Sequence, residues 1–188
     1  GIMVTASHNP ASDNGFKLFD HMGRKLSKDQ ELAIEKQILE VSEVQFADAG
    51  LLAKSLPLLN TLSSYRCHIL SMLPENALSD LRIVADLSNG ATAVTTPTIL
   101  SELGAEVITI GAGAGPINHG VGSEHPKVLA KKVKATQADV GLAHDGDGDR
   151  VILCDNQGKV VHGDKLLGLL ALHAKRKGKL SDSVLVAT

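Results

Sequence analysis

The sequence contains no tryptophan, and aromatic residues make up only 2% of its 188 residues. It therefore lacks the aromatic stacking platforms on which single-stranded nucleic-acid binders and many carbohydrate-binding surfaces depend. Any bound sugar must be held by polar groups instead. No apolar run approaches the roughly 20 residues that span a bilayer, because the longest, residues 166–172, contains Gly168 and stops at His173. We expect no transmembrane helix and no membrane partner.

Cysteine is also scarce, because Cys67 and Cys154 stand alone without paired or metal-knuckle spacing. No leader-like segment opens the sequence, and a reducing cytoplasm is the simplest setting. The formal net charge is −2, with both signs spread along the chain. No basic stripe is available to follow nucleic-acid phosphates, so we expect no nucleic-acid partner. The hydrophobic content of 43% allows one sizeable core and a second, smaller unit.

The hydrophobic pattern predicts the α/β class, with a mixed or parallel sheet flanked by helices. Residues 81–87 and 106–111 are typical of strands joined by a helix over 95–103, as in a β-α-β unit. An amphipathic helix over 126–136, with Val128, Leu129 and Val133 toward the sheet, leads to a third strand. The later elements that we predict are a strand at 138–143, a hairpin at 150–164, a helix at 164–177 and a strand at 183–188.

The first 73 residues lack the β-α-β pattern of the later part of the sequence. Residues 1–5 are typical of a strand, residues 5–15 are rich in turn formers, and residues 27–40 predict a surface helix with Ser27 as its cap. Another helix is predicted over 61–73. The first and last strands have no evident partner upstream or downstream, so we expect the sequence to be a piece of a longer protein.

The turn-rich loop places a hydroxyl nucleophile beside a histidine and an asparagine, in the order TASHNP. Backbone N–H groups in such a turn can face an anion, which suits a phosphorylated Ser7. Taken alone, Ser7 and Asn9 fit turn or capping residues equally well. The longer string favours a functional role, because a second turn at residues 13–15 folds the chain back and lets Lys17 reach a phosphate on Ser7.

A second motif, HDGDGDR, alternates Asp145, Asp147 and Asp149 with glycines. Glycine permits backbone conformations that turn the three carboxylates inward on one cation, whereas an extended strand would spread them apart. The alternative is a solvated acidic turn. Three carboxylates this close repel each other unless a cation or a basic group neutralises them, so we predict a metal site.

Magnesium is the metal that this motif favours. A calcium EF-hand fails, because its sixth position needs Gly where Arg150 stands and its twelfth needs Glu where Asn156 stands. Magnesium prefers oxygen ligands and commonly binds a few carboxylates together with a phosphate, so a phosphate on Ser7 is the natural further ligand. Three aspartates and a phosphoserine carry a charge of about −5, which one divalent cation only partly offsets. Lys17 and Arg150 are the candidates for the remaining neutralisation.

Both motifs resemble signatures of the phosphohexomutase superfamily. The string T-A-S-H-N-P-x-x-D-N-G-x-K is similar to its phosphoserine loop, and Ser7, His8, Asn9 and Lys17 match it position by position. The string GLAHDGDGDRVILCDNQGKVVHGD resembles its metal-loop region over more than twenty residues. By this resemblance, Ser7 carries the transferable phosphoryl group.

Further segments extend the resemblance over nearly the whole chain and favour the phosphoglucosamine mutases within the superfamily. DLSNGAT resembles the D-x-x-N-G-A segment that opens a second domain, and GSEHPKVL resembles G-S-T-H-P-E-x-L. Two positions depart from the pattern: His144 stands where these proteins usually have Phe or another apolar residue, and His162 where phosphoglucosamine mutases usually have Asp. Neither departure removes a metal ligand.

The resemblance implies three domain pieces in this chain. Residues 1–60 would be the end of a first domain with the phosphoserine loop, 61–177 a second domain with the magnesium loop, and 178–188 the start of a third. The implied reaction interconverts glucosamine 6-phosphate and glucosamine 1-phosphate through phosphoserine and a bisphosphate, feeding UDP-N-acetylglucosamine and cell-wall precursor synthesis. One magnesium ion would serve each site.

The resemblance also implies roles for individual residues. Ser7, His8, Lys17 and Arg150 would be catalytic, while Asn9, Lys17 and Arg150 would bind substrate or phosphate. The metal ligands would be Ser7 and the three aspartates. His8 would assist proton movement or, equally, orient the loop by hydrogen bonding.

Three alternatives stay open at this point. Phosphomannomutases and phosphoglucomutases share both loops and differ chiefly in a sugar-reading loop expected farther along. The chain by itself would otherwise be a metal- and phosphate-binding fragment without turnover, because half the expected site is missing. A phosphatase-like hydrolase with an aspartate nucleophile is the third, although it would leave the Ser7 loop without a purpose.

Overall fold

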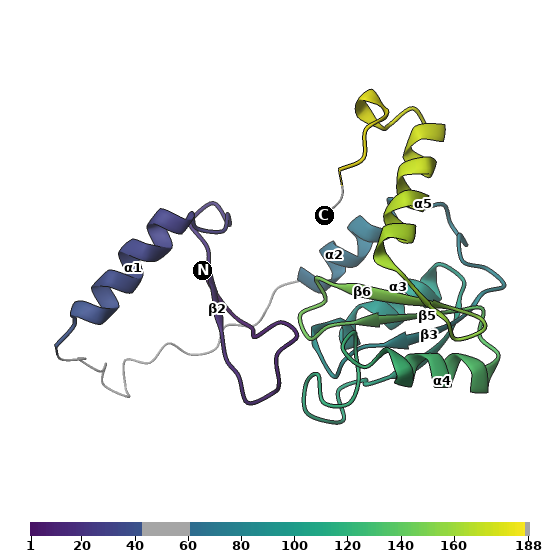
Figure 1. The fold of residues 1–188 in the computed structure, drawn as a ribbon, viewed down its shortest axis with the longest axis horizontal. Coiled ribbons are helices and arrows are strands. Elements are labelled where there is room, and N and C mark those ends of the chain that lie inside the picture. The colour runs from purple at the N-terminus through teal and green to yellow at the C-terminus, as the bar shows by residue number, and fades with distance from the viewer. Residues whose placement is uncertain (43–60, 187–188) are drawn as a thin grey trace.

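The computed structural model describes residues 1–42 and 61–186, and Figure 1 shows their arrangement. A short hairpin and one helix come first, and the larger α/β unit follows. The elements in chain order are β1 (Ile2–Val4), β2 (Phe16–Leu18), α1 (Lys28–Glu40), α2 (Thr61–Leu70), β3 (Arg82–Asp86), the 3-10 helix η2 (Ala91–Val94), α3 (Thr96–Glu102), β4 (Glu106–Ile110), α4 (Pro126–Thr136), β5 (Val140–His144), β6 (Val151–Asp155), β7 (Val160–Val161), α5 (Gly163–Arg176) and the 3-10 helix η3 (Ser181–Ser183).

The strand predicted at the start of the chain forms, and its partner is β2. The two strands pair antiparallel, with Met3 opposite Lys17. The Thr5 N–H donates to the Gly15 carbonyl at 2.9 Å, which closes the loop between them. The hairpin therefore presents residues 5–15 as one bounded loop, with Lys17 on the returning strand.

Helix α1 begins where the sequence predicts, because two reciprocal hydrogen bonds cap its first turn. Ser27 Oγ accepts a hydrogen bond from the Gln30 N–H, and Gln30 Oε1 accepts one from the Ser27 N–H. This reciprocal pair is a capping box, which satisfies two of the N–H groups that a helix start leaves free. No residue of α1 is buried within the described structure, so the predicted surface helix is confirmed.

The larger unit is a five-stranded sheet in the order β4-β3-β5-β6-β7. Strands β4, β3 and β5 run parallel, while β6 and β7 are antiparallel to their neighbours. The crossover from β3 to β4 runs one way along the sheet, and that from β4 to β5 runs back past β3. Right-handed crossovers in opposite directions place α3 and α4 on opposite faces, as Figure 1 shows. The predicted α/β class with a mixed, helix-flanked sheet is confirmed.

The core lies between the sheet and α4. Val84, Leu129, Val133 and Cys154 are fully buried there. Gly141 in β5 makes this packing possible, because a Cβ at that position would lie 2.6–2.8 Å from side-chain atoms of Val133, Cys154 and Leu129. The helix can therefore approach β5 closely only where the strand has no side chain.

Three local predictions need correction. Val128 is 38% exposed, since it lies about 100° around the helix from Leu129 and falls at the edge of the buried face. Helix α2 ends at Leu70, and residues 71–73 form turns. The last predicted strand is absent over residues 184–186, because an extended segment becomes a strand only by pairing and no neighbour pairs with it in the described structure. Residues 187–188 lie outside that structure.

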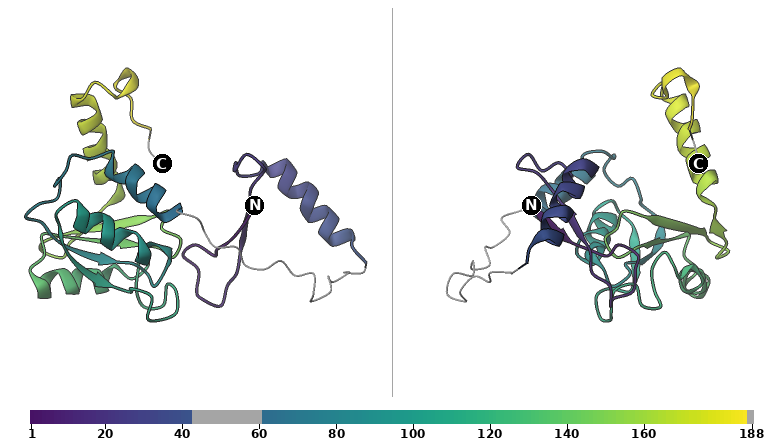
Figure 2. Two further views of the ribbon diagram at one scale, coloured as in Figure 1. Left: turned by 180° about the vertical axis from the view of Figure 1, so that it is seen from behind. Right: turned by 60° about the vertical axis from the view of Figure 1, so that its left-hand side comes forward.

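Helix α5 leaves the edge of the sheet and stands away from it, as the views in Figure 2 show. None of its residues is buried in the part of the chain that is described, and Leu169, Leu170 and Leu172 are each more than half exposed. Among the described residues, no helix combines the length and the apolar character that a membrane span requires.

The two free cysteines are expected to differ in reactivity. Cys67 is exposed on α2 and Cys154 is buried, and burial raises the pKa of the Cys154 thiol. Less thiolate and less access should make Cys154 at least about ten-fold slower to alkylate. Iodoacetamide at pH 8, followed by peptide mass mapping, should label Cys67 in the native chain and both residues in urea. Equal native labelling would contradict the buried position of Cys154 in β6.

Candidate active site

The site lies at the carboxyl ends of β3 and β5. From β3 the chain crosses over to β4 on one side, and β5 lies on the other, so the strand order reverses here. Open α/β sheets bind ligands at such a point, because strand ends and helix starts diverge and leave polar backbone groups unpaired. Asp145 directly follows β5, and the turn after β3 contains Ser88, Asn89 and Gly90.

The aspartate loop is folded so that its three carboxylates converge. Asp145 is fully buried, and its Oδ1 accepts a hydrogen bond from the Arg150 N–H at 3.0 Å. Gly148, at φ +77°, turns the chain between Asp147 and Asp149. One oxygen from each aspartate lies within 4.8 Å of the others. The spacing read from the sequence is thus realised as a cluster.

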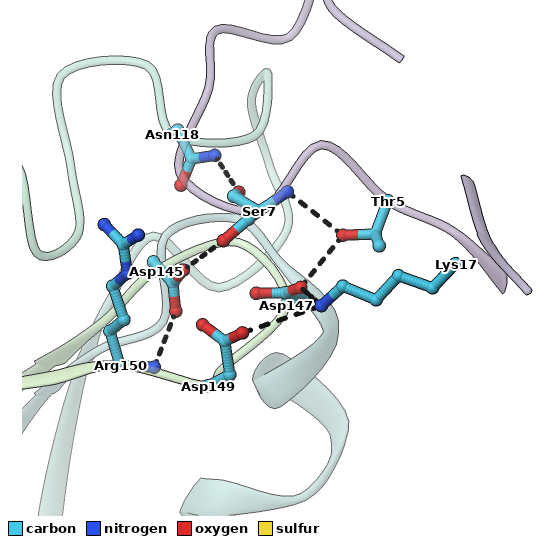
Figure 3. Close-up of polar contacts among 8 residues, drawn as sticks. All are labelled: Thr5, Ser7, Lys17, Asn118, Asp145, Asp147, Asp149 and Arg150. Carbon is cyan, nitrogen blue, oxygen red and sulfur yellow. Dashed lines mark hydrogen bonds and ion pairs between the residues drawn. The ribbon is translucent and has the colours of Figure 1, made fainter. Parts of the chain in front are cut away.

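The Ser7 loop reaches this cluster directly, as Figure 3 shows. Ser7 Oγ donates a hydrogen bond to Asp145 Oδ2 at 2.9 Å. Thr5 Oγ1 donates to Asp147 Oδ2 at 3.1 Å and accepts from the Ser7 N–H at the same distance. Two hydroxyl groups of the hairpin loop therefore bond two carboxylates of the sheet loop. The sequence reading did not single out Thr5, although it belongs to the same motif.

Lys17 places a positive charge beside the carboxylate cluster. Its Nζ lies 2.7 Å from Asp147 Oδ2 and 3.6 Å from Asp149 Oδ2. The hydrogen bond to Asp147 raises the pKa of Lys17. Burial opposes ionisation of Asp147, but hydrogen bonds from Lys17 and Thr5 outweigh it, so the pKa of Asp147 is lowered. Both partners are therefore charged at neutral pH.

The remaining predicted residues occupy different positions around the loop. Arg150 bonds Asp145 through its backbone N–H, and within the described structure its guanidinium has no hydrogen bond or ion pair. Asn9 Nδ2 donates to Asp13 Oδ2 at 3.0 Å, a bond internal to the loop. His8 Nδ1 is buried and has no partner among the described residues. These contacts leave the predicted roles of Arg150, Asn9 and His8 as predictions.

His144 ends β5 just before the cluster. Its Nε2 lies 3.2 Å from Thr96 Oγ1, and its Nδ1 is buried without a partner in the described part of the chain. Burial lowers the pKa of His144 despite the nearby charges of Asp145 and Asp86. The ring is therefore neutral at pH 7, and this departure from an apolar residue adds no charge to the aspartate loop.

The residues present fit a hard divalent cation. Carboxylate oxygens are the donors that magnesium prefers. Asp147 Oδ1 is buried and has no hydrogen-bond partner among the described residues, so it is available to a ligand. Asp145, Asp147 and Asp149 are thus the residues that could hold a metal.

Two glycines let the loops approach each other. A Cβ on Gly146 would lie 2.7 Å from the Ser7 carbonyl oxygen and from Ile117 Cδ1. A Cβ on Gly90 would collide with the Gly146 carbonyl, which accepts a hydrogen bond from the Ala91 N–H at 2.9 Å. Backbone therefore packs on backbone where the Ser7 loop, the aspartate loop and the β3 turn meet.

Gly146→Ala is expected to push the Ser7 loop off the aspartate loop, since the added methyl group meets the Ser7 carbonyl oxygen and the side chains of Ile117 and Asn118. Overpacking of this kind costs about 1–3 kcal/mol, which urea unfolding would measure, while hydrogen exchange would show faster amides over residues 5–15. Gly168→Ala is the matched control, because nothing lies within 4 Å of a Cβ at that helical position. The control should be neutral or slightly stabilising. An unchanged Gly146→Ala would show that the loops do not pack as described.

Fold and site together define a class: α/β proteins in which a serine loop meets clustered carboxylates at the carboxyl edge of the sheet. Comparison with known protein families supports this class. A family model described as phosphoglucomutase/phosphomannomutase, alpha/beta/alpha domain II, matches residues 63–158, and the corresponding domain I model matches residues 1–45. The chain belongs to the phosphoglucomutase/phosphomannomutase family.

Individual relatives narrow the comparison. The chain is 43% identical over 191 residues to a phosphoglucosamine mutase of Nautilia profundicola and 41% identical over 201 residues to one of Helicobacter pylori. All of this chain is covered, but only 43% of each relative. A solved structure of a putative phosphomannomutase from Thermus thermophilus shares the fold at a TM-score of 0.73 and 27% identity, over 95% of this chain and 41% of that one. The chain thus spans less than half the length of these relatives.

Proposed function

We propose that this chain is part of a phosphoglucosamine mutase, which interconverts glucosamine 6-phosphate and glucosamine 1-phosphate through phospho-Ser7 and a bisphosphate. The observation that supports this most directly is the 2.9 Å hydrogen bond from Ser7 Oγ to Asp145 Oδ2, inside a cluster of three carboxylates. The curated relatives at 41–43% identity are named phosphoglucosamine mutases, which favours glucosamine over mannose or glucose.

The chemistry divides into two transfers. In the first, the Oγ–P bond of phospho-Ser7 breaks, a substrate hydroxyl oxygen takes the phosphoryl group, and the hydroxyl proton passes by way of a base to Ser7 Oγ. His8 is the candidate base, since it adjoins Ser7 and its Nδ1 is unpartnered in the described structure. After the sugar turns, its other phosphate moves to Ser7 Oγ and the proton returns to the freed sugar oxygen.

The chain's own residues would prepare these transfers by position and charge. Lys17 holds Asp147 and reaches Asp149, so its ammonium lies where a phosphate on Ser7 would need a cation. Arg150 and Asn9 are proposed to bind phosphate oxygens. Magnesium, held by the aspartates and the Ser7 phosphate, would neutralise charge on the transferring group.

We assign the proposed domains as residues 1–60, 61–177 and 178–188, and the cytoplasm as the compartment. The matches to domain I over 1–45 and domain II over 63–158 support the first boundary, whereas the third piece rests on resemblance alone. The assignment to the cytoplasm is supported by Cys67 and Cys154, which are both free, as is usual in a reducing compartment. The product would feed UDP-N-acetylglucosamine and cell-wall precursor synthesis.

A hydrolase with an aspartate nucleophile is less well supported. Asp145 already accepts hydrogen bonds from Ser7 and from the Arg150 N–H, and Asp147 is ion-paired with Lys17. A hydrolase with an aspartate nucleophile also leaves the placement of Ser7 beside these carboxylates unexplained, whereas phosphoryl transfer through Ser7 explains it.

The test is intact mass and phosphopeptide mapping after incubation with glucosamine 1,6-bisphosphate and magnesium, on this chain and on the full-length protein. We expect one phosphoryl group on Ser7. The full-length protein should then interconvert glucosamine phosphates faster than mannose or glucose phosphates, and the reverse preference would favour a phosphomannomutase or phosphoglucomutase. No phosphate on Ser7 in the full-length protein would reject the mutase assignment, and a phosphorylated chain without turnover would identify a metal- and phosphate-binding piece.

A further inference from the structure

A single buried side chain outside both motifs holds the Ser7 loop. Asn118 lies in the connection between β4 and α4 and is only 9% exposed. Its amide Nδ2 donates to the Ser7 carbonyl at 2.7 Å and to the Asn9 carbonyl at 2.9 Å. Both protons of one amide are therefore used on the two carbonyls that flank His8 (Figure 3 labels Asn118 and Ser7).

The sheet unit fixes the orientation of this amide. Asn118 Oδ1 accepts a hydrogen bond from Ser88 Oγ at 2.6 Å, and the Asn118 N–H donates to the Ser88 carbonyl at 2.9 Å. Ser88 is fully buried, and its own N–H donates to Asp86 Oδ1 at 3.1 Å. Because the carbonyl oxygens of Ser7 and Asn9 can only accept, the amide must turn its NH₂ group to the Ser7 loop and its oxygen to the Ser88 hydroxyl.

The backbone conformation of the loop at Ser7 requires stabilising contacts. Ser7 has φ +51°, a left-handed conformation that a residue with a side chain adopts only when its surroundings enforce it. The Asn9 N–H donates to the Ala6 carbonyl at 3.0 Å, but this bond leaves the Ser7 carbonyl free. Asn118 is the group that bonds this carbonyl on one side of Ser7, while Asp145 accepts from Oγ on the other.

We infer that Asn118 is a positioning residue for phosphoryl transfer at Ser7. By fixing the carbonyls of Ser7 and Asn9, it sets the backbone angle that points Ser7 Oγ at Asp145. Transfer in line demands this direction, because a misplacement of about 1 Å can cost roughly 10²-fold in rate. The inference rests on the proposed function, since it concerns the same serine.

The variants follow from the backbone at Asn118, whose φ is +59°. Asn118→Gly removes the amide and tolerates this angle. Asn118→Asp keeps the size and also tolerates the angle, but replaces both donors with acceptors. Asn76→Gly is the matched control, an asparagine at φ +56° in the turns after α2, where its carbonyl accepts the Ser79 N–H.

Three readouts on the 188-residue chain and the full-length protein separate positioning from general damage. In both Asn118 variants, phosphorylation of Ser7 by glucosamine 1,6-bisphosphate should slow by about 10- to 100-fold. Amides of residues 5–15 should exchange faster, while those of β3 and β5 keep their protection. Magnesium affinity of the unphosphorylated Asn118→Gly chain should stay within about two-fold, because the aspartates remain. Asn76→Gly should match the wild type throughout.

Each result decides the inference. Slower phosphorylation with local loosening and unchanged magnesium affinity supports it. If Asn118→Gly is phosphorylated at the wild-type rate, or its loop amides keep their protection, the inference is overturned while the proposed function stands. If magnesium affinity falls in parallel with the rate, Asn118 is structural rather than positioning. If even the full-length wild type accepts no phosphate, the proposed function fails, and the inference fails with it.

Discussion

Ser7→Ala is expected to abolish acceptance of a phosphoryl group from a sugar bisphosphate, by at least about 10³-fold. The variant loses the only atom of that side chain that can bind phosphorus. It keeps Cβ, so the left-handed backbone at Ser7 carries the same strain as before. Intact mass after incubation with glucosamine 1,6-bisphosphate and magnesium measures the effect directly.

Ser12→Ala is the matched control for this change. Ser12 lies in the same loop, and its hydroxyl is exposed and donates to Asp13 Oδ1 at 3.2 Å. It should be phosphorylated on Ser7 like the wild type. If Ser7→Ala still gained a phosphoryl group that mapped to Asp145 or Asp147, the serine mechanism would be wrong and the aspartate-nucleophile alternative would regain support.

Asp147→Asn should weaken magnesium binding by about 10- to 100-fold and slow phosphorylation of Ser7. The change removes one of three clustered carboxylates and the charge that pairs with Lys17 at 2.7 Å. The strands of the five-stranded sheet should keep their stability, because the pair joins strand β2 of the hairpin to a loop at the edge of that sheet. Isothermal titration with magnesium and urea unfolding would measure the two quantities separately.

Glu40→Gln gives the control, since it neutralises one carboxylate at the end of α1 in an exposed pair with Lys36. Exposed pairs of this kind contribute little, so both magnesium affinity and unfolding should match the wild type. Unchanged magnesium affinity in Asp147→Asn would count against the metal assignment. A large loss of sheet stability would instead show that Asp147 serves mainly to join the hairpin to the larger unit.

The parallel part of the fold was predictable because each element had its own local signal. Helix α4 was predicted at its observed bounds, with Pro126 at its first turn, where the missing N–H is harmless. Strand β2 was missed, because three residues with Lys17 in the middle are too short for a period-two pattern. The strand predicted at the end of the chain failed for the opposite reason: its composition is strand-like, but pairing comes from tertiary structure.

The site was predictable as two motifs, but the contacts that join them were not. Serine and aspartates were each marked by residue type and spacing. Lys17 was predicted to reach a phosphate on Ser7; in the structure its ammonium pairs with Asp147 and Asp149, and its contact with a phosphate stays a prediction. Nothing in the sequence marked Asn118, which lies in a glycine-rich connection and acts through a side chain buried by the fold. The assignments of His8 and Arg150 stay predictions, because no side-chain contact of either residue in the described structure tests them.

The hydrogen bond from Ser7 Oγ to Asp145 has a consequence for how the hairpin adheres to the sheet. It exists only while the hydroxyl keeps its proton. Once Ser7 carries a phosphate dianion, like charges face each other across the same gap, and cohesion must come from Lys17, from a bound cation and from uncharged contacts such as the Asn118 amide. A protein phosphorylated on Ser7 would therefore depend on counter-charge to keep the hairpin on the sheet, and its hairpin would be more sensitive to ionic strength and to chelators than that of the unphosphorylated protein.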